Sequence, residues 1–254
     1  MDRMIGERDI MGGLAKGLAV IETFSADRPR QSISEVAAAS GLDRATARRC
    51  LLTLAHHGYA DYDGKFFTLT PRVLRLGTAC LATMPLPQIV QPFLDDLSER
   101  VGQSSSVSIL DGGEIVYVAR AAQRRVMSIA LMPGSRLPAY CTSMGRVLLA
   151  ALPEGEAARI LGPGPLPRRT ARSLTDPRAV IAELARVRAQ GHALIDQEVE
   201  EGLCSVAIPI LNARGRVVAA LNIGAPATVP LDEMAGRYLE ALREVQGRLR
   251  AILT

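Results

Sequence analysis

The pattern of apolar and polar residues in the N-terminal part of the chain is helical. Residues 13–24 carry large apolar side chains three or four positions apart, at Leu14, Leu18, Ile21 and Phe24, and this spacing predicts an amphipathic helix. Residues 32–35 read SISE, the form of a capping box, in which serine and glutamate side chains accept hydrogen bonds from each other's backbone amides. We therefore predict a second, short helix directly after Ser32.

A third helix and a hairpin follow this short helix. Gly41 ends the second helix, Asp43 is a favourable N-cap, and the helical pattern continues to about His57. The stretch YADYDGKFFTL alternates around the Asp-Gly pair at 63–64, which predicts a hairpin with a type I′ turn. Three helices, two of them joined by a short glycine turn, and a hairpin predict a winged helix-turn-helix domain over residues 10–70.

Beyond this domain the pattern predicts a linker and a second domain. Pro71 suits the first turn of a helix and later prolines interrupt that helix, so we assign residues 71–86 to a helical linker. Two later stretches alternate with period two, around Asp-Gly-Gly and Ala-Arg-Gly, and predict hairpins. Helical patterns lie at residues 86–102, from about 142, at 178–190 and at 231–253. Together they predict an α+β domain on an antiparallel sheet over residues 87–254.

Composition and charge narrow the function classes only a little. The formal net charge of +4 is small for 254 residues, so a nucleic-acid footprint has to come from local placement of charge. The four cysteines show no CxxC spacing and the three histidines are scattered, so we expect no disulfide framework, no metal site and no cofactor. The N-terminus lacks the apolar core of a signal peptide, and no run approaches the roughly 18 apolar residues of a membrane span, so we expect a cytoplasmic protein without membrane contact.

The third predicted helix has two faces of different chemistry. A rotation of about 100° per residue collects one apolar arc, which we expect to face the domain core, from Ala47, Cys50, Leu51 and Leu54. The outward face of the first two turns is small and basic, with Arg44, Ala45, Thr46, Arg48 and Arg49. Such a face suits the major groove, where small residues allow close approach and arginines pair with guanine edges or phosphates.

An ordinary solvated helix face is the alternative interpretation of these arginines. The capped helix before them and the hairpin after them favour DNA binding. Lys65 lies beside the hairpin turn, where it either contacts a phosphate or the minor groove as part of the wing or is a solvated lysine. Leu52 falls on the outward side, and only contact with the wing would explain it.

A carboxylate site is predicted where the second domain runs from a strand into the helix near residue 142. The stretch CTSMGRVLLA leaves backbone donors at Ser143, Met144 and Gly145, and a helix N-terminus of this kind binds anions. Arg136 lies just upstream and is a candidate for a bidentate grip on the carboxylate. A capped helix with a surface arginine is the alternative.

Two further polar residues are candidates for the same pocket. Asn222 lies among apolar neighbours in the alternating stretch VVAALNIG, so we expect it to face a cavity and to need a partner there. Asp196 belongs to a carboxylate-rich stretch and either points inward or is solvated.

The motifs ISEVAAASGLDRATARRCLLTLAHHGY, LTPRVLRLG, LPAYCTSMGRVLLA and HALIDQEVEEGLCSVAIPI together resemble the IclR family of bacterial transcriptional regulators. The resemblance covers nearly the whole chain from about Gly13. The wording of LPAYCTSMGRVLLA and ALIDQEVEEGL is most similar to the branch that controls catabolism of aromatic acids through the β-ketoadipate pathway.

This resemblance implies a winged helix-turn-helix domain and an effector domain of GAF-like shape. It implies a homodimer or a dimer of dimers, bound to double-stranded operator DNA through Arg44, Ala45, Thr46, Arg48 and Arg49. It also implies a pocket for a small organic acid, formed by Ser143, Met144, Gly145, Asp196, Ser205 and Asn222. Many relatives have Gly-Lys where this chain has Gly145-Arg146, so a lysine contact is not assumed.

Two other functions fit the sequence less well. An enzyme would need a nucleophile and a base, and the candidates Cys141 or Cys204 with His192 do not form a recognisable site. A metal-responsive winged-helix repressor is the alternative regulator, but cysteines, histidines and carboxylates do not recur at ligand spacing. We therefore expect a regulator and not an enzyme.

Overall fold

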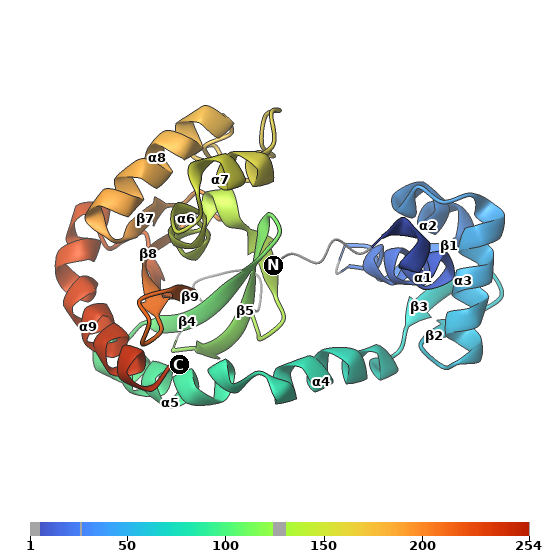
Figure 1. Cartoon of the computed structure of the whole chain (residues 1–254), viewed down its shortest axis with the longest axis horizontal. Coiled ribbons are helices and arrows are strands. Elements are labelled where there is room, and N and C mark those ends of the chain that lie inside the picture. Colours follow the sequence, from blue (N-terminus) through green and yellow to red (C-terminus); the bar gives the residue numbers. More distant parts are fainter. Residues whose placement is uncertain (1–5, 26, 124–130, 254) are drawn as a thin grey trace. The chain divides into compact units, whose positions relative to one another are not determined.

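The first of two compact units is a three-helix domain with a small antiparallel sheet. The computed structural model describes residues 6–25, 27–123 and 131–253, and the chain divides into units of residues 1–82 and 83–254. After the 3-10 turn Glu7–Asp9, the first unit contains helices α1 (Gly12–Glu22), α2 (Ile33–Ser40) and α3 (Arg44–His56). Its strands β1 (Arg30–Ser32), β2 (Ala60–Tyr62) and β3 (Phe66–Leu69) pair in the order β1-β3-β2 (Figure 1).

Side-chain caps begin the second and third helices as predicted. In the capping box, the backbone N of Ser32 donates to Oε2 of Glu35 at 2.7 Å, and the backbone N of Glu35 donates to the Ser32 hydroxyl at 3.4 Å. Asp43 Oδ1 accepts from the backbone N of Thr46 at 2.9 Å. Gly41 has a φ of 68°, which an L side chain rarely adopts. The chain therefore turns between α2 and α3 where the glycine permits it.

The apolar arc of α3 faces the core of the first unit. Ala47 and Leu51 are fully buried, and Leu52 packs partly against the same cluster. The outward position predicted for Leu52 is therefore wrong, because α3 buries a wider stripe than the predicted arc. In α1 the opposite holds, since Leu14 and Leu18 stay 60% and 47% exposed.

The hairpin of the first unit has a different turn from the predicted type I′. That type needs positive φ at both central residues, whereas Gly64 alone among residues 59–69 has it, at 101°. Asp63 instead holds the turn through its side chain, because its Oδ1 accepts from the backbone N atoms of Lys65 at 3.0 Å and Phe66 at 2.8 Å. The turn is thus closed by a carboxylate.

The second unit is a six-stranded antiparallel sheet with helices on both faces (Figure 1). The strand order is β6-β5-β4-β9-β8-β7, with the bounds β4 Ser104–Asp111, β5 Glu114–Ala121, β6 Arg136–Pro138, β7 Ala193–Asp196, β8 Leu203–Leu211 and β9 Val217–Pro226. Both predicted hairpins, β4-β5 and β8-β9, are present. A six-stranded sheet built from these hairpins confirms the predicted α+β class.

The helices divide between the two faces of this sheet. The 3-10 turn Pro71–Val73 and α4 (Leu74–Thr83) precede α5 (Pro85–Val101), and α5 covers one face together with α9 (Leu231–Ile252). The other face carries α6 (Ser143–Ala150), α7 (Glu154–Leu161) and α8 (Pro177–Gln190), with the 3-10 turn Ala139–Cys141 before α6. No single helix of the described residues is long and apolar enough to cross a membrane, although the bent pair 71–80 and 85–101 meets that length and composition together.

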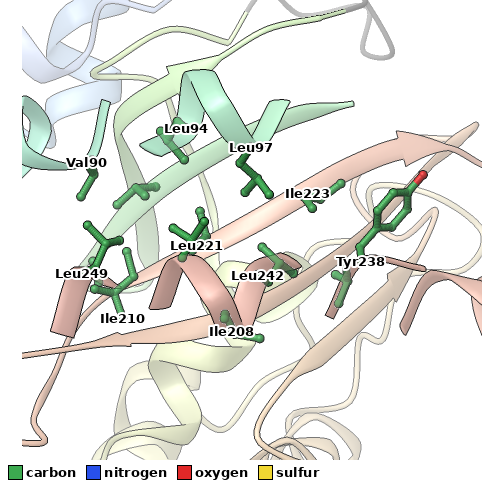
Figure 2. Packing of buried hydrophobic residues seen from close by; sticks show 14 of the residues in the cluster. Val90, Leu94, Leu97, Ile208, Ile210, Leu221, Ile223, Tyr238, Leu242 and Leu249 are labelled. Carbon is green, nitrogen blue, oxygen red and sulfur yellow. The ribbon is translucent and has the colours of Figure 1, made fainter. Parts of the chain in front are cut away.

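The period of two along the strands sorts side chains between the two faces. In β9, Leu221 and Ile223 point toward α5 and α9 and pack with residues such as Leu94 and Leu242 (Figure 2). Asn222, between them, points toward α6. The α5–α9 face is therefore a closed apolar core, whereas the α6 face combines apolar packing with polar strand residues.

Leu242→Ala is expected to lower the free energy of unfolding by about 2–5 kcal/mol, because the leucine is fully buried between α9 and the sheet and its removal leaves a cavity. Guanidinium unfolding followed by circular dichroism measures the change. Ile252→Ala, in the same helix but 48% exposed, is the control and should cost far less. Equal losses in the two variants would contradict the assigned core.

Candidate nucleic-acid interface and ligand cavity

The exposed face of α3 carries positive charge that no carboxylate of the described residues neutralises. Arg44, Arg48 and Arg49 are exposed, and none of them forms an ion pair within the described chain. Ala45 is also exposed, and Thr46 is half-buried beside the cap. Small and cationic side chains thus share one face, as an approach to a phosphate-lined groove requires.

The wing places a second cation close to a hairpin aromatic. The Lys65 ammonium lies 5.0 Å from the centroid of the Phe66 ring. In β1, which pairs with β3, Arg30 lies 4.2 Å from the same centroid and pairs with Asp63 at 2.5 Å. Because Arg30 is already paired with the carboxylate of Asp63, Lys65 is the better placed of the two cations for a phosphate.

A small cavity lies in the second unit between the sheet and the start of α6. Its volume is about 40 Å³, on a scale where one water needs roughly 10–15 Å³, so an organic ligand requires side chains to move apart. The lining consists of Ser104, Tyr117, Arg120, Leu131, Leu137, Thr142, Ser143, Met144, Ile195, Val199, Leu203, Ser205, Asn222 and Gly224. Four predicted pocket residues, Ser143, Met144, Ser205 and Asn222, therefore come together here.

Polar groups on the cavity wall are arranged for hydrogen bonding to a guest. The Oδ1 atom of Asn222 is buried and has no hydrogen-bond partner within the described residues. Ser205 Oγ donates to Ser143 Oγ at 2.8 Å. Burial raises the pKa of Tyr117 to about 12, so its phenol stays protonated at neutral pH. A buried polar atom without a partner is costly, and a polar ligand would relieve that cost at Asn222.

Arg120 is a cation on the wall of this cavity, and the sequence pattern did not identify it. Its guanidinium is half-buried, donates from Nη1 to Ser106 Oγ at 3.0 Å, and forms no ion pair within the described chain. Burial lowers the pKa of Arg120, yet an arginine remains charged at neutral pH. Within the described residues, the cavity therefore offers a positive charge without a carboxylate partner.

A β-bulge explains why Arg120 faces the cavity. Val107 of β4 pairs with Ala119, while the adjacent Ser108 pairs with Tyr117, so Val118 is an extra residue in β5. A bulge reverses the alternation of a strand beyond it. Tyr117 and Arg120 consequently line the same cavity although three positions separate them.

Arg136 does not grip a ligand as predicted. Its Nε donates to Glu114 Oε2 at 2.7 Å, and its Nη2 lies 2.8 Å from Asp111 Oδ2. Both partners belong to the β4-β5 hairpin, so Arg136 fastens the edge strand β6 to the sheet, and it is absent from the cavity lining. The prediction missed this because strand pairing brings the two carboxylates to the arginine.

Asp196 does not enter the cavity either. Its carboxylate pairs with Arg172 and accepts from Gln197 Nε2 at 3.0 Å and from Cys204 Sγ at 3.3 Å. These hydrogen bonds lower the pKa of Asp196, with Gln197 the largest cause. Of the two interpretations left open above, the inward-pointing one is wrong.

Gly145 serves packing and not the lining of the cavity. Its backbone N donates to Thr142 Oγ1 at 3.1 Å, so the helix cap takes one of the three donors predicted for an anion. A Cβ at this position would lie 2.2 Å from the carbonyl oxygen of Ala139. The glycine therefore allows α6 to pack against the turn before it, while Ser143 and Met144 remain at the cavity.

Cys141, Cys204 and His192, the candidates for a nucleophile and a base, lie in environments that do not activate them. Burial raises the pKa of both Cys141 and Cys204 to about 11, which leaves little of the reactive thiolate at neutral pH. His192 Nδ1 lies 3.1 Å from the carbonyl oxygen of Gln190. No group of three or more histidine, cysteine or carboxylate side chains is placed to hold a metal among the residues searched, which are the described ones.

Gly145→Ala is expected to destabilise the second unit by at least about 1–3 kcal/mol, because overpacking against backbone atoms cannot be relieved by a side-chain rotation. Thermal unfolding of the full chain measures the loss. Gly247→Ala in α9 is the matched control, since a Cβ there meets nothing within 4 Å, and it should be neutral or stabilising. A Gly145→Ala protein as stable as the parent would show that α6 shifts freely.

Comparison with known proteins gives matches to both units. A model described as the IclR helix-turn-helix domain matches residues 13–64, and one described as the C-terminal part of the bacterial transcriptional regulator IclR matches residues 78–249. The chain is 43% identical over 239 residues to the Pca regulon regulatory protein of Pseudomonas putida, covering 93% of this chain and 82% of that protein.

Two further comparisons extend over nearly the whole chain. The p-hydroxybenzoate hydroxylase transcriptional activator of Acinetobacter baylyi is 36% identical over 255 residues, with coverage of 98% of this chain and 94% of that protein. The crystal structure of an IclR homologue from Microbacterium hydrocarbonoxydans, complexed with 4-hydroxybenzoate, matches with a TM-score of 0.72 at 26% identity. This match covers 94% of this chain and 99% of that one.

Proposed function

The chain belongs to the IclR family of bacterial transcriptional regulators, and from this membership we propose its target genes and its ligand. Membership of this family shows that the protein is a DNA-binding regulator and not an enzyme. The matches give no support to the metal-responsive alternative. We propose that the protein controls genes of aromatic-acid catabolism in response to a small organic acid. The names of the Pca and p-hydroxybenzoate relatives support the target genes.

The DNA contacts are proposed for the exposed face of α3 and for the wing. Five residues of α3 enter the major groove in this proposal, namely Arg44, Ala45, Thr46, Arg48 and Arg49. Lys65 contacts a phosphate. The supporting observation is that these cations are exposed and form no ion pair within the described residues. Their charges are therefore available to DNA phosphates and bases.

A homodimer or a dimer of dimers is proposed as the active form, in the cytoplasm where the operator lies. A helix-turn-helix dimer reads two half-sites about one helical turn apart or a multiple of it. The exposed apolar side chains of Met11, Leu14 and Leu18 support contact with a second copy, since such side chains are unfavourable in water. Residues 71–86 act as the linker between DNA-binding and effector domains in this proposal.

The effector site is proposed for the cavity between the sheet and α6. The observation that most supports this site is Arg120, a half-buried cation that faces the cavity without a carboxylate partner in the described chain. A carboxylate there gains a charge-assisted hydrogen bond and lies close to the N-terminus of α6. Asn222, Ser205 and Tyr117 then bind polar substituents, and apolar residues such as Leu137 contact the carbon skeleton.

Replacing Arg48 and Arg49 together with alanine is expected to weaken specific operator binding at least about 30-fold, because each arginine–base contact contributes about 1–3 kcal/mol. Footprinting and fluorescence anisotropy on the upstream region of the protein's own gene measure it. The control replaces Arg237 and Arg243, which are exposed in α9, and should bind as the parent does. Unchanged operator binding by the α3 variant would refute the interface.

Arg120→Met is expected to weaken binding of the effector acid by about 10-fold or more, because a hydrogen bond to a charged group contributes about 1.5–3 kcal/mol. Met144→Trp should block binding by filling the cavity. Calorimetry with benzoate, 4-hydroxybenzoate and adipate covers aromatic and dicarboxylic acids. Arg136→Met is the matched control, since Arg136 pairs with carboxylates outside the cavity. A parent protein that binds none of these acids, or variants that bind them normally, would contradict the proposed site.

A further inference from the structure

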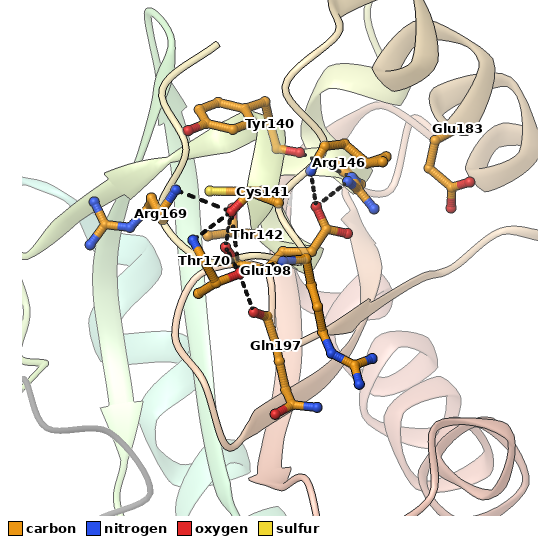
Figure 3. Close-up of polar contacts among 12 residues, drawn as sticks. Tyr140, Cys141, Thr142, Arg146, Arg169, Thr170, Glu183, Gln197 and Glu198 are labelled. Atoms are coloured by element: carbon orange, nitrogen blue, oxygen red, sulfur yellow. Dashed lines mark hydrogen bonds and ion pairs between the residues drawn. The ribbon is translucent and has the colours of Figure 1, made fainter.

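A buried ion pair outside the cavity joins two of its walls. Arg146, in the first turns of α6, has a side chain 3% exposed, and its Nη2 donates to Oε2 of Glu198 at 2.7 Å. Its Nε donates to the carbonyl oxygen of Tyr140 at 3.0 Å. Figure 3 shows the two side chains pointing toward each other from different segments. Neither side chain belongs to the cavity lining.

Desolvation makes such a pair a poor source of stability, since apolar residues of similar volume would often serve the fold equally well. This pair is also embedded in further hydrogen bonds. Glu198 Oε2 accepts from the backbone N of Leu174 at 3.1 Å, and the carbonyl oxygen of Glu198 accepts from Ser173 Oγ at 2.7 Å. The ion pair therefore fastens three segments together, which are α6, the loop before α8 and the turn that carries Glu198.

The turn that carries Glu198 spans residues 197–202 between β7 and β8 and has an unusual backbone. Gln197 adopts a φ of 57°, a left-handed conformation that is uncommon for a residue other than glycine. Its side-chain Oε1 accepts from the backbone N of Gly202 at 2.9 Å, so the turn is closed on itself. Val199, next to Glu198, lines the cavity. The same turn thus presents one residue to the cavity and its neighbour to Arg146.

Helix α6 has a corresponding division. Ser143 and Met144 line the cavity at its N-terminus, and Arg146 lies two positions beyond Met144. A bond from Arg146 to Glu198 consequently determines how far the cavity residues of α6 lie from Val199. The carbonyl oxygen of Val199 also accepts from Arg169 Nε at 3.3 Å, which holds the turn from the side of the loop.

We propose that Arg146 and Glu198 are positioning residues for the effector, which hold the 197–202 turn against α6 so that the two walls of the cavity meet a ligand at the correct separation. The inference rests on the proposed effector site. Neither residue touches the effector, and their contribution reaches it through Val199 and through the start of α6.

The test compares Arg146→Met and Glu198→Gln with Arg172→Met in the full-length protein. Arg172→Met is the matched control, because it removes an arginine that pairs with Asp196 beside the same turn but is 58% exposed. Calorimetry with 4-hydroxybenzoate should show binding at least about 10-fold weaker in the first two variants and nearly unchanged in the control. The double variant should be no weaker than the weaker single one, since both remove the same interaction. Operator affinity without effector should stay as in the parent.

A measurement without ligand keeps the inference testable if 4-hydroxybenzoate is not bound. Hydrogen exchange of the amides in 197–202 should be at least about 10-fold faster in Arg146→Met than in the parent, and unchanged in Arg172→Met.

If Arg146→Met only lowers the melting temperature and leaves both affinity and exchange unaltered, the pair is purely structural and the inference is overturned. If Arg120→Met abolishes binding while Arg146→Met does not alter it, the positioning role fails and the proposed effector site stands. If no acid of the panel binds, the effector site fails and the exchange result alone decides whether the pair holds the turn.

Discussion

Burial of both faces of one antiparallel sheet is the constraint on which the second unit depends. Strand side chains alternate between faces, so every polar residue in a central strand has to find a partner among the helices that cover it. On the α5–α9 side, Ser105 meets this demand by donating to the carbonyl oxygen of Leu94 at 3.1 Å. On the α6 side, Asn222 Oδ1 has no hydrogen-bond partner and Arg120 has no ion-pair partner among the described residues. This difference between the faces supports the proposed effector site.

The polar groups of the cavity suit an organic acid, whereas its volume does not admit one without movement of side chains. A void of about 40 Å³ is too small for an aromatic acid, so lining side chains have to move before one can bind. Two of its walls belong to α6 and to the 197–202 turn, and the buried ion pair fixes the separation of these two segments. Because two charges cannot be separated cheaply inside the protein, room for a ligand has to come from movement of the lining side chains and not from separation of these two segments.

Periodicity and capping rules were sufficient for most of the fold and for part of the site. The SISE box, the Asp43 cap and the two hairpins of the sheet follow from local sequence chemistry, and alternation alone placed Asn222 toward a cavity. Arg120 was not predicted as a cavity residue because the extra residue at Val118 reverses the alternation of β5. No local sequence pattern indicates that bulge. Arg136 was misassigned because its carboxylate partners are distant in sequence and are brought to it only by strand pairing.

The carboxylate-rich stretch DQEVEEG shows the same limit in a sharper form. Asp196 and Glu198 are two residues apart and chemically alike, yet Asp196 pairs with an exposed arginine whereas Glu198 is buried against Arg146. The left-handed backbone of Gln197 turns the chain between them, so strand alternation does not continue. A non-glycine residue keeps such a conformation only when its surroundings hold it there, and here those surroundings are the hydrogen bonds of the turn and the ion pair on α6. The left-handed residue, the buried charges and the cavity wall are therefore parts of one arrangement, because Gln197, Glu198 and Val199 follow one another in the same turn.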